Sequence, residues 1–250
     1  MLNQKYPTLS KPPIQTAVFQ IGFDSISSFP FKDELINAFA KKISNVFTVF
    51  NRNYNRTLEL GKVRHEDKKV KISEPIIDTY IFASSDNSLV INITKSSFIF
   101  ETRKYTTWEK QIDQLREIWS IYSDMILAGG YKVNRASTRF INRIEIPEMV
   151  DPTQYFNTTL YAASNVIQGE VDSFLIRYTT KLKDIDIQTH VTQGFEPAIG
   201  KIFPFVFDID VISLKELTYN NLWDEFDILR KVKNKTFFSN LTEKTLNLLL

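Results

Sequence analysis

The stretch "STRFINRIEIP" (Ser137–Pro147) decides the fold that we expect for this chain. It is rich in β-forming residues and follows the two-residue period of a strand, so we predict a long strand over residues 132–147. One face of that strand carries three arginines, Arg135, Arg139 and Arg143. The other face carries Ala136, Thr138, Phe140, Asn142, Ile144 and Ile146. The stretch therefore raises the question of what the three arginines bind.

Working outward, the same periodicities predict strands and helices along the rest of the chain. A two-residue period or a β-rich composition predicts strands over 14–23, 171–182, 184–193 and 203–213, and three short ones within 78–103. A helical period predicts helices over 31–47 and 106–130, the latter ended by Gly129–Gly130, and a long helix or helix pair over 221–250. Residues 51–75 read as a polar loop or hairpin tip, residues 152–164 are a weak stretch, and Lys183–Asp184 is the expected turn of a hairpin.

This order of elements predicts an α+β protein. We expect two tandem, mostly antiparallel sheets, each covered by helices and packed into one compact body. The halves would be residues 1–130 and 131–250, intimately packed or forming one domain, because no Pro- or Gly-rich linker separates them. A tandem duplication is an architectural hypothesis, since no residue-by-residue repeat is visible.

Composition excludes several classes of site. The 250 residues include 20 Phe and 10 Tyr but 7 Gly, which favours helix-covered sheets and leaves little room for glycine-rich phosphate loops. A net charge of +2 is too small for a general polyanion binder, so nucleic acid is not indicated. With no Cys there is no disulfide, thiolate nucleophile or Cys-based zinc site. No apolar run approaches the length of a membrane span, and we expect a cytoplasmic protein without a cofactor.

The arginine row has three interpretations. Arg135, Arg139 and Arg143 step by about 13 Å along an extended strand, and guanidinium groups suit bidentate binding of carboxylate or phosphate. The row is thus a candidate anion site. Alternatively, "FVFDIDV" places Asp208 and Asp210 on one strand face, where they would neutralise Arg139 and Arg143 in a cross-strand ladder. A plain solvent-exposed face is the third interpretation.

"DIDIQTH" raises the question of a metal site. Read as a strand, it puts Asp184, Asp186, Gln188 and His190 on one face, with carboxylate and imidazole ligands for a divalent cation. The same pattern is typical of a half-solvated antiparallel strand, and same-face residues about 6.5–7 Å apart converge poorly on one ion. We therefore predict a surface strand and no metal site.

The remaining candidates have structural explanations. His65 stands in the charge run "RHEDKK" (64–69) and is expected in an exposed loop. Tyr105 and Trp108 precede and begin the central helix, where they either stack on a ligand or clamp the helix to the sheet, with Thr106 or Thr107 as N-cap. No GxSxG, Walker A, GxGxxG or HExxH motif is present, so we predict no catalytic residues.

Several stretches together resemble an uncharacterised, sporadically distributed bacterial protein family of unknown function. They are "KPPIQTAVFQIGF", "YTTWEK", "RFINRIEIP", "FVFDIDV" and "FFSNLTEKTLNLL", which span most of the chain. The chain departs from the family at Lys104, where a proline is usual, and at Arg230, where a histidine is usual. The resemblance implies an accessory role, such as one in mobile-element or defence-associated genes, and no established activity.

The sequence thus favours a binding or interaction protein over an enzyme. Arg139 and Arg143 would clamp an anionic small molecule, Arg135 would lie at the rim, and Asp208 and Asp210 would orient the arginines. One alternative is an enzyme on a phosphorylated or nucleotide substrate, with a divalent metal held by Asp208 and Asp210. Another is an assembly protein that binds a protein partner or itself.

Overall fold

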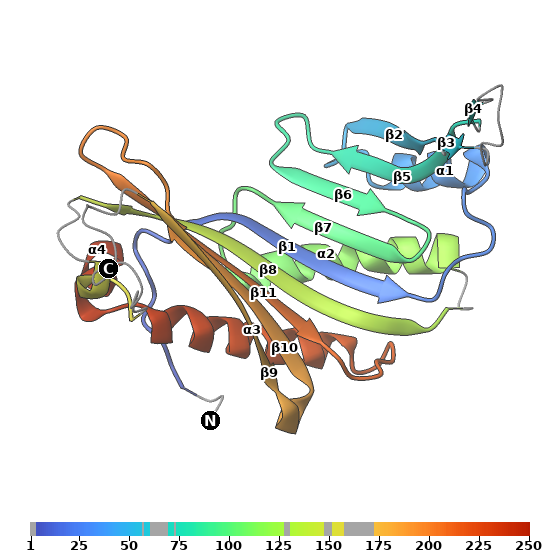
Figure 1. Ribbon diagram of the computed structural model, residues 1–250. Helices are drawn as coiled ribbons and strands as arrows, with labels where there is room; N and C mark the ends of the chain where they lie inside the picture. Colours follow the sequence, from blue (N-terminus) through green and yellow to red (C-terminus); the bar gives the residue numbers. More distant parts are fainter. Residues whose placement is uncertain are drawn as a thin grey trace. The chain divides into compact units, whose positions relative to one another are not determined.

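A computed structural model describes residues 4–56, 58–60, 70–72, 74–127, 131–147, 152–157 and 173–250 (Figure 1). Its strands are β1 (Ile14–Phe23), β2 (Val49–Asn55), β3 (Leu58–Leu60), β4 (Val70–Ile72), β5 (Ile76–Ala83), β6 (Leu89–Ile93), β7 (Ser97–Thr102), β8 (Val133–Ile146), β9 (Phe174–Leu182), β10 (Ile187–Phe195) and β11 (Phe203–Ser213). Its α-helices are α1 (Asp33–Lys42), α2 (Trp108–Tyr122), α3 (Leu222–Asn240) and α4 (Glu243–Leu249).

The predicted α+β class with antiparallel strands is confirmed, but the prediction of two tandem sheets is wrong. Nine strands are hydrogen-bonded in the order β2-β5-β6-β7-β1-β8-β11-β10-β9, and β3 and β4 form a second, two-stranded sheet. In this order the nine strands belong to one sheet, where the sequence suggested two. Strand patterns predict where strands occur, but they do not predict which edge a strand joins.

The described residues form two compact units, each assembled from separate stretches of the chain. Unit 1 combines residues 1–21, 103–105 and 133–250, and unit 2 combines residues 22–102 and 106–132. The division into halves at residue 130 stays a prediction.

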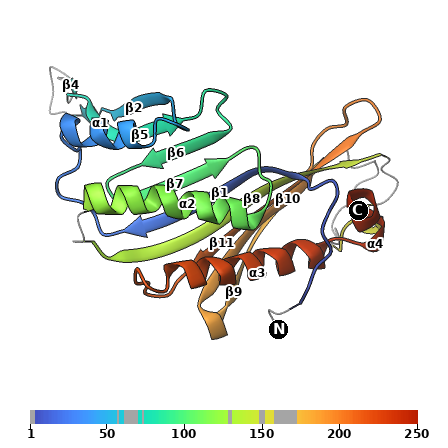
Figure 2. The ribbon, with the colours of Figure 1, turned by 180° about the vertical axis from the view of Figure 1, so that it is seen from behind.

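In unit 1, helix α3 covers one face of the strands β8 and β11 (Figure 2). The apolar face of "STRFINRIEIP" lies on this side, and Phe140 and Ile144 are buried there. Phe19 meets Phe140 edge-on at 6.0 Å between ring centroids, and Phe207 stacks on Phe237 at 5.8 Å. These contacts place the arginine side of β8 on the opposite face, which none of the described helices covers.

Of the two arrangements predicted for the C-terminal segment, a long helix or a helix pair, the structure shows the pair. Helix α3 buries a stripe of Leu222, Phe226, Leu229 and Val232. After a break at Leu241, Thr242 caps α4 by accepting a hydrogen bond from the backbone N–H of Thr245.

In unit 2, the strands β2, β5, β6 and β7 pair in that order, and α1 and α2 pack beside each other. Helix α2 buries a stripe of Trp108, Ile112, Leu115, Trp119 and Tyr122, with Trp119 edge-on to Phe98 at 5.5 Å. Thr107 is its N-cap and accepts from the backbone N–H of Lys110 at 3.3 Å. The helix continues as a π-helical segment over Ser123–Leu127, and Gly129–Gly130 lie outside the described residues.

Candidate functional site: the arginine face of unit 1

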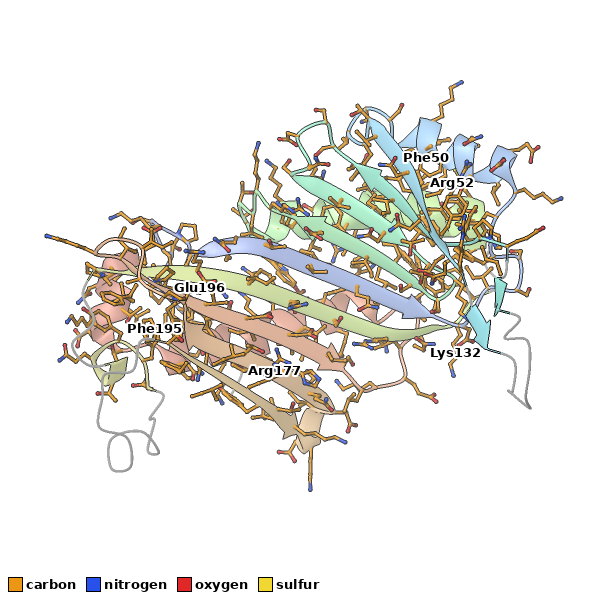
Figure 3. The ribbon with its side chains drawn as sticks, turned by 45° about the horizontal axis from the view of Figure 1, so that its top comes forward. Phe50, Arg52, Lys132, Arg177, Phe195 and Glu196 are labelled. Carbon is orange, nitrogen blue, oxygen red and sulfur yellow. The ribbon has the colours of Figure 1, made fainter. Side chains whose placement is uncertain are left out.

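The candidate site is the face of β8, β11, β10 and β9 opposite α3, which we call the arginine face. The strand register sets its side chains: β11 places Asp210 opposite Arg139 and Asp208 opposite Ile141, and β10 places His190 opposite Asp210. On β9, Arg177 stands opposite Thr192, which itself faces Asp208. Figure 3 views the ribbon from this side and labels Arg177 and Glu196.

Arg139 and Asp208 form a two-pronged ion pair. The Nε of Arg139 lies 2.9 Å from Oδ1 of Asp208, and its Nη2 lies 2.6 Å from Oδ2. The hydrogen bonds that Asp208 accepts raise the pKa of the Arg139 guanidinium, so it stays fully charged. Asp208 is 16% exposed and Arg139 is 49% exposed, and the Nη1 of Arg139 donates to no acceptor in the described part of the chain. The pair fixes the guanidinium and leaves one edge of it open to a ligand.

Asp210 is a partly buried carboxylate of this face. Burial raises its pKa, although the positive charges of Arg135, Arg139 and His190 act in the opposite direction. Desolvation therefore outweighs the attraction of the neighbouring arginines. Asp210 acts as a shared counter-charge at the centre of the face and forms no hydrogen bond with the described residues.

The ladder predicted between the arginines and Asp208 and Asp210 forms in part. Arg143 pairs with Glu196, just after β10, at 2.9 Å from Nη1 to Oε2, and not with an aspartate. The register explains this, because β11 places Val206 opposite Arg143. Arg135 is exposed and forms no ion pair with a described residue.

Arg177 and Glu196 belong to this face and were not among the candidates named from the sequence, whereas His190 was considered only as a metal ligand. The alternation of Phe174–Leu182 puts Arg177 on a polar strand side, but only the pairing of β9 with β10 brings it to the arginines of β8. Arg177 also forms no hydrogen bond or ion pair with a described residue. Glu196 follows a strand end, where no periodicity predicts the direction of its side chain.

The "DIDIQTH" stretch is only partly a strand. Residues Lys183–Ile185 form a 3-10 turn, and Asp186 has a left-handed backbone with φ of 49°. Asp184 and Asp186 therefore leave the face that Gln188 and His190 share. The imidazole of His190 contacts Thr179 through Nδ1 at 2.9 Å and Gln188 through Nε2 at 2.8 Å. Within the described residues, no group of three or more His, Cys, Asp or Glu side chains is arranged to hold a metal ion.

Tyr105 and Trp108 lie in packed surroundings. Tyr105 meets the ring of Phe140 edge-on at 5.4 Å, and Trp108 is buried at the start of α2. Both observations favour the clamp over the ligand-stacking interpretation. His65 and the "RHEDKK" run lie outside the described residues.

Comparisons with known proteins leave the chain without an assigned family. No protein-family model matches it, and no curated protein matches it either. Among the described residues, no helix has the length and apolar character needed to span a membrane.

Proposed function

We propose that this chain is a binding protein whose arginine face takes a ligand carrying carboxylate or phosphate groups. The main observation in support is the arrangement around Arg139. Asp208 orients its guanidinium through Nε and Nη2, which leaves Nη1 available to a ligand. Arg135 on β8 and Arg177 on β9 add two cationic side chains without ion-pair partners among the described residues. An oriented guanidinium loses little freedom on binding, which favours recognition of a planar anion.

The charge balance of the face argues for a selective ligand. Asp208, Asp210 and Glu196 lie among the arginines, so the face repels an indiscriminate polyanion while still offering local cationic positions. The proposal includes a cytoplasmic location, which cell fractionation would test.

The test is a thermal-shift screen of the full chain against phosphate, pyrophosphate, citrate and mononucleotides, each with and without Mg²⁺. A ligand at a hundred times its Kd adds about 2.7 kcal/mol of stability, which is a shift of several degrees for a domain of this size. The double variant Arg135→Ala/Arg177→Ala should lose that shift. Without ligand, it should melt at the same temperature as the parent chain. Arg116→Ala, on the exposed side of α2, is the matched control that should keep the shift.

The outcomes separate the alternatives. No shift with any anion would overturn the proposal and favour a protein partner. A shift that requires Mg²⁺ would favour the enzyme alternative, in which Asp208 and Asp210 hold the metal.

Self-association is a second candidate, because β9 is the last strand in the order and its outer edge pairs with no described strand. Leu175 on β9 is 68% exposed. Exposed strand edges of this kind pair with other chains. Sedimentation analysis over a range of concentrations tests it, and Leu175→Lys should shift the distribution toward monomer.

A further inference from the structure

The strand β9 is the last strand of the nine-stranded sheet. Its inner edge pairs with β10 from Phe174 to Leu182 without a bulge, and its outer edge pairs with no described strand. The N–H and C=O groups that point outward from β9 therefore have no ladder partner in the described part of the chain. The strand contains no proline, so a further strand can pair along its whole length.

On the arginine face, β9 carries two cations and no carboxylate. Arg177 and Lys181 are exposed on this side, and neither forms a hydrogen bond or ion pair with a described residue. They are four residues apart, which is about 13 Å along a strand. Asp184 is the next carboxylate along the chain, and it lies beyond the strand in the 3-10 turn.

The other described carboxylates of the arginine face lie away from these cations. Asp208 and Glu196 are each paired with an arginine of β8. Asp210 and Glu145 lie on β11 and β8, and β10 separates both of those strands from β9. The two cations of β9 are thus available to a partner that approaches from outside the sheet.

On the side of the sheet that α3 covers, contacts fix the position of β9. The hydroxyl of Tyr178 forms a hydrogen bond with the side chain of Asn240, the last residue of α3. Phe174 meets Phe195 of β10 edge-on at 5.3 Å between ring centroids. Between these two anchors, Ile176 is half-buried. A docking strand would meet an edge that is already ordered, which lowers the entropic cost of binding.

We propose that the outer edge of β9 binds an extended acidic segment of a partner protein as an added strand. The main chain of the segment would pair with the outward N–H and C=O groups of β9, and its side chains would alternate between the two faces of the sheet. Two Asp or Glu residues, four positions apart, would lie opposite Arg177 and Lys181. On the other face, apolar residues of the segment would lie beside Ile176 and Tyr178.

Charge favours this occupant over a second copy of the chain. A second β9 would bring the same two cations and no carboxylate, and like charges across a strand pair are destabilising. The inference rests on the proposed function, because it names an acidic protein segment as the carboxylate-bearing ligand of the arginine face. It adds main-chain pairing, which a small anion cannot supply.

The experiment measures the binding of labelled peptides to the folded full-length chain by fluorescence anisotropy. The probe alternates valine with glutamate, threonine and glutamate, so that its two carboxylates are four positions apart on one face. A comparison peptide has lysine in place of glutamate. We expect the glutamate peptide to bind about tenfold more tightly, and this difference to shrink at high salt.

Two further peptides test the main-chain pairing. One is N-methylated at its valines and the other at the remaining positions, so each lacks the hydrogen-bond donors of one strand edge. One of the two should lose binding to β9, and the other should keep it. Equal binding of both forms would mean carboxylate contacts without strand pairing, which contradicts the proposal.

The charge-reversal variant Arg177→Glu/Lys181→Glu should prefer the lysine peptide over the glutamate peptide. Because both positions are exposed, the variant should fold as the parent chain does. Lys231→Glu/Lys235→Glu, on the exposed side of α3, is the control with the same change of net charge, and it should keep the parent's preference. A reversal variant that still prefers the glutamate peptide would place the peptide elsewhere.

The outcomes separate this inference from the proposed function. Small anions that stabilise the chain while neither peptide binds would keep the arginine face as an anion site and overturn strand addition at β9. Binding of the glutamate peptide without any small-anion shift would support strand addition and count against the proposed function. A chain that sediments as a dimer and excludes both peptides would assign the edge to a second copy instead.

Discussion

At the scale of the residue, the two-pronged pair of Arg139 and Asp208 predicts a measurable coupling energy. Asp208 is mostly shielded from solvent, whereas Arg139 is half exposed, so the pair is stronger than a fully exposed one. A double-mutant cycle with Arg139→Ala and Asp208→Ala should give a coupling of about 1 kcal/mol by urea unfolding. Arg135→Ala, which breaks no ion pair with a described residue, should change stability by less than about 0.5 kcal/mol. A coupling near zero would show that Asp208 does not hold the guanidinium.

Asp210 predicts an unusual dependence of stability on pH. Its pKa is raised by burial, so the folded state binds a proton more readily than the unfolded chain does. Between the unfolded and folded pKa values, stability therefore falls as the pH rises, and the cost is fully present above the folded pKa. Asp210→Asn should be more stable than the parent chain at pH 7, and the difference should shrink as the pH falls through the folded pKa and be gone below the unfolded pKa of about 4.

Urea unfolding of Asp210→Asn and the parent at pH 7 and at acid pH checks this sign. The matched control is Asp184→Asn, in the exposed turn after β9, which should change little at either pH. If Asp210→Asn were less stable at pH 7, the attraction of Arg135, Arg139 and His190 would outweigh desolvation, and the face would be a tighter ion network than we infer.

At the scale of the element, the start of α2 depends on one hydroxyl. Thr107 Oγ1 accepts from the backbone N–H of Lys110, which would otherwise lack an intrahelical partner. Thr107→Ala should cost about 1 kcal/mol of unfolding free energy. Thr106→Ala, one residue earlier and outside the cap, should cost clearly less. Equal losses from the two substitutions would contradict the assignment of the cap.

The pairing of β9 with β10 requires a glycine at position 194. A Cβ there would lie 2.1 Å from the carbonyl oxygen of Phe174, so the two strands would have to separate. Gly194→Ala should cost more than about 2 kcal/mol and should speed amide exchange in β9. Gly200 has a φ of +64° but open space around its Cβ position, so Gly200→Ala should cost only about 1–2 kcal/mol. Slower or unchanged exchange in β9 of Gly194→Ala would contradict this.

Local sequence patterns predicted individual helices and strands well. They predicted poorly which side chains of different elements come into contact. The apolar stripe of α2 and the alternation of β8 are visible in the sequence, because the polarity of each residue indicates whether its side chain is buried. The 3-10 turn at Lys183–Ile185 was not visible, because "DIDI" alternates as a strand would. At the candidate site, the pairing of Arg139 with Asp208 was foreseen as an alternative. The pairing of Arg143 with Glu196 was not, because it depends on the register of β10, β11 and β8 together.

At the scale of the whole molecule, the N-terminal segment is part of the same compact unit as the C-terminal half. Phe19 of β1 is fully buried and packs on Phe140 and Phe226. The carbonyl of Pro13 accepts from the N–H of Arg143, and the N–H of Lys11 donates to the carbonyl of Leu249. Residues far apart in the sequence thus complete one core.

A fragment of residues 131–250 should therefore fail to reach the native state alone. Loss of Phe19 by itself would cost about 3–5 kcal/mol, a large share of a typical total of about 5–15 kcal/mol. Near-ultraviolet circular dichroism should show the fragment without fixed aromatic packing, and added peptide 1–23 should restore part of the signal. A fragment that folds cooperatively without the peptide would instead support two separable halves at residue 130. A scrambled peptide of equal composition is the control, because recovery with it would mean that unspecific apolar contact, and not the packing of Phe19 on Phe140, orders the fragment.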